Sequence, residues 1–384
     1  MSLRQMFAGS IVKPGFNPLA AQTTTTLYNL YSWGANPYGG LGLGNTTYYS
    51  SPMQVGSLTN WLQLSASYGT SMAIKTDGTL WGWGYNNYGQ LGLGNTTNYS
   101  SPKQVGALTT WSKVSTGTYL STQPLTAAVK TDGTLWTWGR NFYGGLGLGN
   151  TTNYSSPMQV GSLTNWLNVY SGGNWVMALK TDGTLWGWGG NGFGNLGLGN
   201  TTNYSSPKQV GSLTNWAFIS VPCVNSIFVL AVKTNGTLFS WGGNPQGNLG
   251  LNNLTYYSSP KQIGALTTWA KCANGGNYFA LAVKTNGTLW SWGVNGQGRL
   301  GLGNTTYYSS PKQVGSLTNW NLVFCGDSFS SAIKTDGTLW TWGQNNYGQL
   351  GFGNTTSYSS PKQLGSSTAW QTVGAGKITM LALG

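Results

Sequence analysis

A tryptophan-rich stretch followed by a glycine-rich run returns seven times along this chain. In the second copy the stretch reads Leu-Trp-Gly-Trp-Gly at residues 80–84. The second tryptophan of each copy is Trp33, Trp83, Trp138, Trp188, Trp241, Trp292 or Trp342, so consecutive copies lie 50 to 55 residues apart. Long-period self-similarity is typical of solenoids and propellers, because one unit cannot bury its apolar face without its neighbours. The repeat therefore predicts one array of packed units, although 384 residues would suffice for two ordinary domains.

Each repeat predicts four short antiparallel strands. In the second copy, residues 61–66 alternate between apolar and polar, and residues 71–75 are mostly apolar. The Asp77-Gly78 pair that follows is a strong hairpin signal, and residues 80–83 form the third strand. Its two tryptophans point to one face, and the glycine between them is expected to let a neighbouring backbone approach. Residues 101–105 contain a proline, which suits only an edge strand.

The two ends of the chain predict how the array closes. After Trp370, residues 371–373 and 377–383 supply two strands, but the hairpin and the third strand are missing. Residues 27–34 supply the missing third strand at the start of the chain. Sharing one unit between the ends pairs edges that would otherwise be exposed. The predicted fold class is all-β, a seven-bladed β-propeller of four-stranded antiparallel blades, closed by pairing of the N- and C-terminal strands.

Residues 1–26 lie outside the repeat and divide the chain into an N-terminal arm and a propeller at residues 27–384. The arm has neither a helical nor a strand period, and it resembles a signal peptide poorly because Lys13 and two prolines interrupt it. We therefore expect no Sec-type export, and no stretch is long and apolar enough to span a membrane. The arm is predicted to anchor the propeller to other protein subunits of a particle. Its candidate assembly residues are Met6, Phe7, Ile11, Val12 and Phe16.

The repeated sequence motifs resemble those of a known family. Each copy approximates Trp-Gly-x-Asn-x-x-Gly-Gln-Leu-Gly-x-Gly, preceded by Asp-Gly-x-Leu-x-x-Trp-Gly and followed by Ser-Pro. This pattern resembles the RCC1-type repeat of seven-bladed propellers, and the resemblance covers residues 27–384. The family includes a nucleotide-exchange factor on chromatin, an enzyme inhibitor, ubiquitin-ligase modules, and phage and bacterial proteins. The near-identical units, the Asn-Thr-Thr loops and the short arm look closest to the phage and bacterial members.

The residue inventory argues against catalysis. The chain has no histidine and no glutamate, so acid–base chemistry would fall to other groups. Four of the five acidic residues stand in the predicted hairpin turns: Asp77, Asp132, Asp182 and Asp336. Asn235 and Asn286 fill the same turn position in two other repeats, so these aspartates are predicted to be structural. Asp327 alone forms neither a catalytic dyad nor a metal site, and we expect no enzyme, exchange activity, cofactor or metal.

Two further residue types are predicted to be structural. The three cysteines, Cys223, Cys272 and Cys325, have no disulfide or metal-binding spacing and are expected to be buried thiols. The recurring Asn-x-Thr or Asn-x-Ser triplets are expected to form turns rather than to carry glycans. Their asparagines are Asn45, Asn95, Asn150, Asn200, Asn253, Asn304 and Asn354.

Charge is scarce and mostly positive. There are 18 Lys and Arg against 5 acidic residues, for a net charge of +13. This excess permits an anionic partner but selects none, and both sets of repeated lysines are expected to form a solvated rim. The first set is Lys75, Lys130, Lys180, Lys233, Lys284 and Lys334. The second set is Lys103, Lys208, Lys261, Lys312 and Lys362.

The second lysine set and the tyrosines before Ser-Ser-Pro form a candidate ligand rim. These tyrosines are Tyr49, Tyr99, Tyr154, Tyr204, Tyr257, Tyr308 and Tyr358. They either stack against a sugar or a protein partner, or pack with the hydroxyl bonded to a loop.

The function predicted first is a non-enzymatic structural or adhesive component of a phage virion, displayed on the particle surface, with a host glycan or protein as ligand. The alternative is a soluble binding module, lectin-like or inhibitory, in the cytoplasm or outside the cell. Nucleic-acid association ranks third, because no interleaving of aromatic and basic residues supports it.

Overall fold

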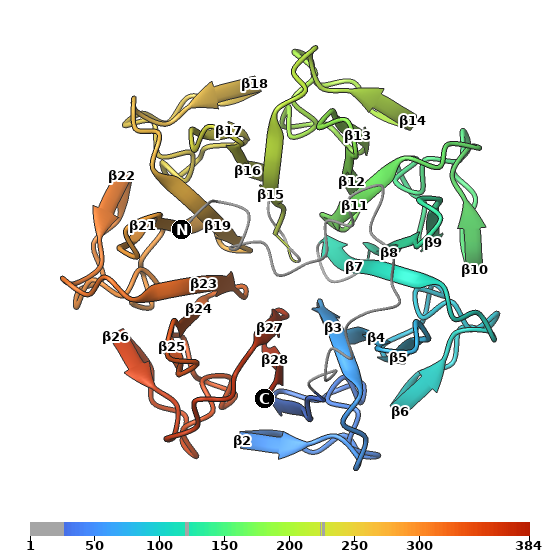
Figure 1. Ribbon diagram of the computed structural model, residues 1–384, viewed down its shortest axis with the longest axis horizontal. Helices are drawn as coiled ribbons and strands as arrows, with labels where there is room; N and C mark the ends of the chain where they lie inside the picture. The colour runs from blue at the N-terminus through green and yellow to red at the C-terminus, as the bar shows by residue number, and fades with distance from the viewer. Residues whose placement is uncertain (1–26, 120–122, 223, 225–226) are drawn as a thin grey trace, which may run out of the picture.

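The computed structural model describes residues 27–119, 123–222, 224 and 227–384. Within them the chain forms seven four-stranded antiparallel sheets arranged as blades in a ring (Figure 1). The strand nearest the axis of each blade is β3 (Trp61–Ala66), β7 (Trp111–Tyr119), β11 (Trp166–Ser171), β15 (Trp216–Ser220), β19 (Trp269–Gly275), β23 (Trp320–Cys325) or β27 (Thr372–Ala375). This is the seven-bladed propeller that the repeat predicts.

The second strand of each blade is β4 (Thr70–Lys75), β8 (Gln123–Lys130), β12 (Trp175–Lys180), β16 (Phe228–Lys233), β20 (Phe279–Lys284), β24 (Phe329–Lys334) or β28 (Thr379–Leu383). The third is β5 (Leu80–Gly84), β9 (Leu135–Gly139), β13 (Leu185–Gly189), β17 (Leu238–Gly242), β21 (Leu289–Gly293), β25 (Leu339–Gly343) or β1 (Leu30–Gly34). The outer strand is β6 (Tyr99–Gln104), β10 (Tyr154–Gln159), β14 (Tyr204–Gln209), β18 (Tyr257–Gln262), β22 (Tyr308–Gln313), β26 (Tyr358–Gln363) or β2 (Tyr49–Gln54). The repeated proline therefore lies on an edge strand, as expected.

One blade is built from both ends of the chain, which confirms the predicted closure. Its strand order is β2-β1-β28-β27. Strand β1 pairs with β28 in an antiparallel register that runs from Leu30 opposite Leu383 to Gly34 opposite Thr379. The backbone N–H of Asn29 also donates to the carbonyl of Gly384 over 3.0 Å. Closure therefore depends on strand pairing between the first and last elements of the ring.

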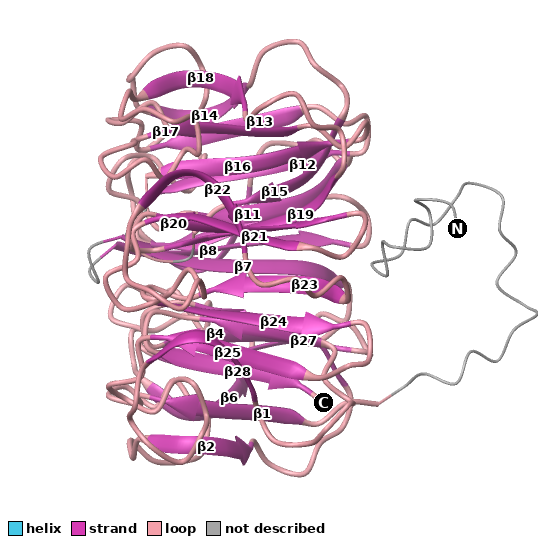
Figure 2. Cartoon of the chain, turned by 90° about the vertical axis from the view of Figure 1, so that its left-hand side faces the viewer, coloured by secondary structure: helices cyan, strands magenta, loops and turns pink. Residues whose placement is uncertain are grey.

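The ring has two different faces, with loops on both sides of the blades (Figure 2). We call one the hairpin face, because the turns between second and third strands lie there. In such a turn Asp77 accepts a hydrogen bond from the backbone N–H of Thr79 over 2.9 Å, and Asn235 accepts the equivalent bond in another blade. The turn aspartates are therefore structural, as predicted. We call the opposite side the loop face, because it carries the long connections from third to outer strands.

The core lies between adjacent blades, around the second tryptophan of each Trp-x-Trp pair. Trp188, for example, is fully buried, and its indole N–H donates to the Gly145 carbonyl of the preceding blade over 2.9 Å. All seven tryptophans donate in this way, at 2.9 to 3.0 Å: Trp33, Trp83, Trp138, Trp188, Trp241, Trp292 and Trp342. Trp33 bonds to Gln349, so the same contact joins the last loop to the first blade.

The residue between the two tryptophans faces a side chain as well as the backbone that was expected to approach it. A Cβ on Gly82 would meet the Met72 sulfur at 2.8 Å and the Leu91 carbonyl oxygen at 3.3 Å. Five repeats carry serine or threonine at this position. Each of those hydroxyls donates to a leucine carbonyl nine residues on: Ser32, Thr137, Ser240, Ser291 and Thr341. The position therefore takes a small residue that ties the third strand to the following loop.

The first lysine set does not form a solvated rim, so that expectation is wrong. Lys75 is only 5% exposed, and its ammonium lies 3.8 Å from the ring centroid of Trp81 and 4.9 Å from that of Trp61. The other five members lie over equivalent ring pairs. Burial lowers the pKa of Lys75, and the two rings replace part of the lost hydration through cation–π attraction.

Candidate binding surfaces

No catalytic constellation is present among the described residues. They contain no group of three or more His, Cys, Asp or Glu that could hold a metal ion. Cys272 and Cys325 are buried, as predicted, and burial raises the pKa of the Cys272 thiol, which makes it a poor nucleophile. Cys223 lies outside the described residues. No helix in the described part of the chain is long and apolar enough to cross a membrane.

Asp327, the one aspartate outside a hairpin turn, lies on the loop face in the turn between β23 and β24. Burial raises the pKa of its carboxyl group, and the charges of Lys377 and Arg299 oppose that shift. Its Oδ2 accepts hydrogen bonds of 3.4 Å from Asn277 and Ser328. No second carboxylate is positioned with it, so it lacks the partner that general acid–base chemistry by paired carboxylates requires.

The predicted rim tyrosines all bond to their own loops. Tyr99, for example, accepts a hydrogen bond from the Asn95 amide over 3.2 Å, and each of the other six accepts one from its equivalent asparagine. The same asparagines also cap the turns, as expected, because their Oδ1 atoms accept from the backbone two residues on. This is the packing arrangement that the sequence left open.

The lysines of the predicted rim lie beside these tyrosines on the outer strands. Lys103, Lys208, Lys261, Lys312 and Lys362 lie 4.2 to 5.6 Å from the ring centroids of Tyr99, Tyr204, Tyr257, Tyr308 and Tyr358. Residues four apart on a strand share one side, so each lysine covers its tyrosine. Ligand binding by this rim stays a prediction.

A contiguous strip of aromatic and basic side chains crosses three blades on the loop face. We call it the aromatic band, and its members are Tyr38, Tyr68, Tyr85, Tyr88, Arg140, Phe142, Tyr143 and Lys377. At one end the Lys377 ammonium lies 4.8 Å from the ring centroid of Tyr68. Tyr38 then contacts Tyr68 edge-to-face at 5.9 Å and Tyr85 at 4.7 Å. Burial raises the pKa values of Tyr68 and Tyr85, so both hydroxyls stay protonated.

The other half of the aromatic band is organised by Arg140, which follows β9. Its guanidinium lies 4.6 Å from the ring centroid of Tyr88 and 5.3 Å from that of Phe142. It also donates a 3.0 Å hydrogen bond to the Tyr88 hydroxyl. Phe142, which is 53% exposed, packs edge-to-face on Tyr143 at 4.6 Å. The arginine thus fixes two neighbouring loops in one arrangement.

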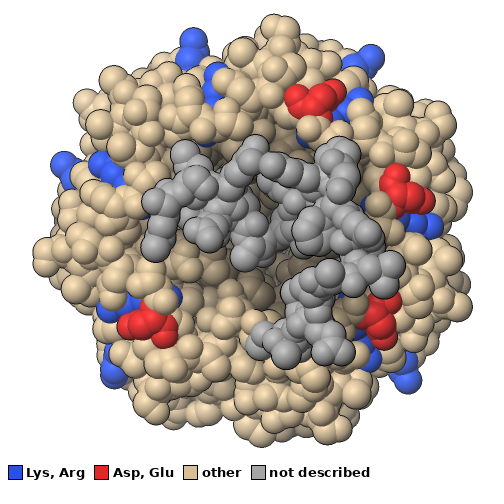
Figure 3. Space-filling model, viewed as in Figure 1, with Lys and Arg blue, Asp and Glu red and all other residues tan. Residues whose placement is uncertain are grey.

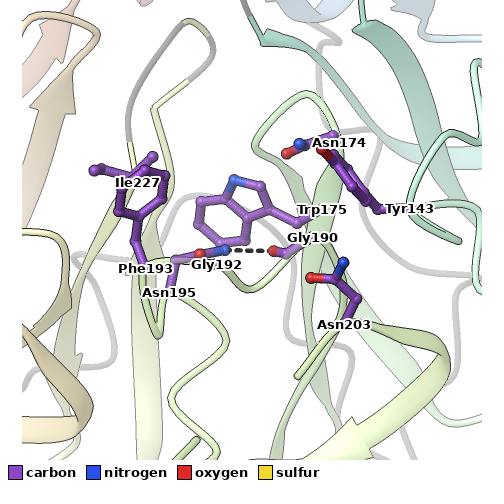
Figure 4. A pocket seen from close by; sticks show the side chains of 9 residues that line it. All are labelled: Tyr143, Asn174, Trp175, Gly190, Gly192, Phe193, Asn195, Asn203 and Ile227. Atoms are coloured by element: carbon purple, nitrogen blue, oxygen red, sulfur yellow. Dashed lines mark hydrogen bonds between the residues drawn. The ribbon is translucent and has the colours of Figure 1, made fainter. Parts of the chain in front are cut away.

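A small pocket continues the aromatic band beyond Tyr143 (Figure 4). Its volume is about 160 Å³, and Trp175, Phe193 and Ile227 supply apolar walls. Asn195 donates to the Gly190 carbonyl over 2.8 Å at its floor. None of its lining residues is charged. The pocket has room for one ring-sized group rather than a drug-sized ligand, because typical ligand pockets hold roughly 300–1,000 Å³.

Charge differs between the two faces. Acidic side chains stand next to basic ones on the hairpin face (Figure 3), where the turn aspartates lie. On the loop face no member of the aromatic band is acidic, and Asp327 lies near Lys377 at one end. The aromatic band is therefore the better candidate for contact with an anionic partner.

The aromatic band was missed by sequence reasoning, which found no aromatic–basic interleaving. Tyr68 and Lys377 are in contact although more than 300 positions separate them in the chain. Arg140 and Tyr88 belong to different repeats. The turns that carry Tyr68 and Lys377 also have no repeated pattern. These residues are brought together by the rotation of each blade relative to the next around the ring.

Comparison with known proteins identifies the repeat. The model of the Regulator of chromosome condensation (RCC1) repeat matches residues 29–74, 77–122, 132–179, 182–229, 235–283, 286–333 and 336–383. The chain belongs to the RCC1 repeat family. The predicted resemblance is thus confirmed for the repeat and the fold, and this RCC1 repeat propeller is a binding module.

Curated relatives of this RCC1 repeat protein match it only in part. Ultraviolet-B receptor UVR8 of Arabidopsis thaliana is 30% identical over 190 residues, covering 49% of this chain and 32% of that protein. E3 ubiquitin-protein ligase HERC2 of Homo sapiens is 30% identical over 203 residues, covering 52% of this chain and 3% of that protein. Protein RCC2 homolog of Xenopus laevis is 38% identical over 88 residues, covering 22% and 17%. The chain spans a third or less of these relatives.

Solved structures share the fold of this RCC1 repeat protein. Human WBSCR16 superimposes with a TM-score of 0.81 at 20% identity, covering 93% of this chain and 98% of that chain. Prp20p of Saccharomyces cerevisiae gives a TM-score of 0.80 at 17% identity, covering 94% and 92%. At these identities the likeness establishes the architecture alone. The relatives named are eukaryotic, and the expected phage or bacterial character stays a prediction.

Proposed function

We propose that this RCC1 repeat propeller binds a partner protein through the aromatic band, and that the partner presents an acidic surface. The observation that carries the proposal is the contiguity of eight aromatic and basic side chains from three blades. Tyrosine and arginine are enriched among the residues that dominate binding energy at protein interfaces, because they bury a large area and still make polar contacts. Phe142 is exposed, six other members are half-buried and only Tyr85 is buried, so the aromatic band offers a partner a continuous, partly accessible apolar surface.

Preorganisation supports the same function. Arg140 already contacts Tyr88 and Phe142, so a partner would not have to order these side chains on binding. Prp20p is described by its binding to Gsp1p and histones, and yeast RCC1 by a complex with Kap60. Both descriptions concern the same yeast protein, Prp20, which shares the fold of this chain. On that precedent we propose that this chain also recognises a protein. We do not propose that it binds the same partners.

The first test locates the interface by photo-crosslinking. A photoreactive phenylalanine at position 88, inside the aromatic band, is expected to crosslink one defined protein in the native cells. The same group at position 108, which replaces an exposed leucine of the hairpin face, is expected not to capture it. The double substitution Tyr88→Ala and Arg140→Ala should then weaken affinity for the purified partner by at least about 30-fold, because interface hot spots each contribute roughly 2 kcal/mol or more.

A matched control separates the aromatic band from exposed aromatics in general. Tyr307→Ala removes a side chain that is 49% exposed on the same face but outside the band, and it should leave affinity unchanged. Equal binding by the wild type and the double variant would contradict the proposal. So would crosslinking from position 108 alone.

Attachment to a larger particle, with the propeller exposed on a virion surface, is the second candidate function. Residues 1–26, with Met6, Phe7, Ile11, Val12 and Phe16, lie outside the described residues, and the family matches begin only at residue 29. We expect deletion of residues 1–26 to leave a folded propeller that no longer co-sediments with the particle. Unchanged co-sedimentation of the truncated protein would refute anchoring by the arm.

A further inference from the structure

The outer rim of the propeller is more uniform in sequence than its innermost strands. Residues 196–216 and 300–320 differ only at Asn203 and Tyr307, whereas the next four residues, 217–220 and 321–324, share no identity. The uniform segments include many exposed residues, and the divergent ones form the inner strands β15 and β23. Duplication alone would leave both segments equally similar. Exposed positions normally vary most, because substitutions there change stability little.

Not every exposed rim residue has a structural reason to be uniform. The asparagine and the glycine of each turn have one, since they cap loops or adopt positive φ, as Gly161 does at 60°. The repeated leucine has none. It is 44–49% exposed in six repeats: Leu58, Leu108, Leu163, Leu213, Leu266 and Leu317. The seventh repeat carries Ser367 there, so the fold tolerates a polar residue at this position.

Two of these leucines, Leu163 and Leu317, line grooves between adjacent blades. One groove of about 420 Å³ is bounded by Leu148 and Leu163 of one blade and by Trp186, Ser206 and Pro207 of the next. A second groove of about 320 Å³ has the equivalent lining, from Leu302 and Leu317 to Trp340, Ser360 and Pro361. Trp166 and Trp320 also line the two grooves, and each has a buried indole N–H with no hydrogen-bond partner.

The residue types that recur at equivalent positions of the repeats show which chemical groups line the grooves. An aromatic ring occupies the position of Trp186 in every blade: Tyr31, Trp81, Trp136, Trp186, Phe239, Trp290 and Trp340. The Ser-Pro pair is also present in all seven outer strands. The neighbouring lysine is replaced by Met53 and Met158 in two repeats, so positive charge is not what the rim retains. The retained features are an aromatic face, an aliphatic wall and a hydroxyl.

We propose that the inter-blade grooves bind successive units of a neutral polysaccharide. This inference is independent of the loop-face proposal, because the grooves and the aromatic band share no residue. A pyranose ring has an apolar C–H face, which packs on an aromatic ring, and a rim of hydroxyls, which bond to groups such as the Ser206 hydroxyl. Similar sites repeated around a ring suit a ligand whose units repeat, since linked weak sites together give high avidity.

The test compares retention on immobilised neutral polysaccharides, namely a β-glucan, an α-mannan and a galactan. The intact chain is expected to bind at least one of them. Replacing all six leucines by serine should weaken apparent affinity at least about 100-fold, because avidity is lost with every groove. Leu163→Ser alone should change it less than about threefold, since the other five leucines remain. Because Ser367 occupies the leucine position in the seventh repeat, we expect both variants to fold.

The control replaces two leucines outside the grooves. Leu62→Ser with Leu167→Ser changes inner-strand side chains that are 54% and 40% exposed, and it should leave retention unchanged. Three outcomes would overturn the inference: no retention on any of the three polymers, equal retention of the six-leucine variant, or groove-dependent binding of proline-rich peptides in place of polysaccharide. Each is distinguishable from failure of the loop-face proposal, because crosslinking at position 88 does not depend on these leucines.

Discussion

Ending the chain at Lys377 is expected to abolish folding of the propeller. The truncation removes β28, which lies between β1 and β27 in the shared blade. Three of its side chains, Met380, Leu381 and Leu383, are 0–1% exposed. Each contributes about 2 kcal/mol through burial, and their sum of about 6 kcal/mol is comparable to the whole net stability of a typical domain, about 5–15 kcal/mol. We expect an insoluble protein, or one without a cooperative thermal transition by circular dichroism.

A circular permutant separates loss of the strand from any change at a chain end. Because Asn29 and Gly384 are hydrogen bonded to each other, a short linker can join residue 384 to residue 27. Opening the chain between Gly56 and Ser57, in an exposed connection, then makes every blade from consecutive strands. This permutant is expected to stay soluble and to melt cooperatively. A truncated chain that melts like the full-length protein would show that the closing strand is dispensable.

The second large effect is expected from Trp188→Ala. Trp188 is fully buried between two blades, and its indole N–H donates to the Gly145 carbonyl. The substitution leaves a cavity and deprives that buried carbonyl of its donor, so we expect a loss of about 3–5 kcal/mol in the free energy of unfolding. Denaturant titration followed by fluorescence measures this loss directly. The denaturant concentration at the midpoint of unfolding should fall. The dependence of the free energy of unfolding on denaturant should stay constant if the native protein remains equally compact.

The matched control lies two residues away on the same strand. Trp186→Phe also shortens an aromatic side chain, but Phe239 already occupies the equivalent place in another blade. There it packs on Trp216 at 5.4 Å and receives Lys233 at 4.2 Å. We therefore expect a loss below about 1 kcal/mol, the size of one neutral hydrogen bond, here the bond from Trp186 to Thr184. Equal losses for both variants would contradict the distinct roles assigned to the two tryptophans.

Much of the fold was predictable because each repeat carries its own local signals. Alternation in residues 61–66 and the Asp77-Gly78 turn indicated strands and a hairpin, and Thr70–Lys75 is indeed a buried strand. The closing pair β1–β28 followed from counting strands at the two ends. These features depend on neighbours in the chain or on a strand that lacks a partner, and both can be read from one sequence.

Side-chain contacts that these local signals do not specify could not be placed in the same way. Lys75 looks solvent-facing in the sequence, yet it is buried against two tryptophans of its own blade. The aromatic band depends on contacts such as that of Lys377 with Tyr68. The rim groove is lined by Leu163 of one blade and Trp186 of the next.

The amino-acid sequence by itself thus determined the number of blades, their strands and the blade shared between the two ends. Hydrophobic period, turn residues and repeat length act within a unit of about 50 residues, and a single unit displays them all. The tertiary structure alone decided which loops meet on the loop face and which side chains line the grooves between blades. Those contacts arise from the rotation of each blade against the next around a closed ring, and no residue pattern along one unit encodes which partner it meets.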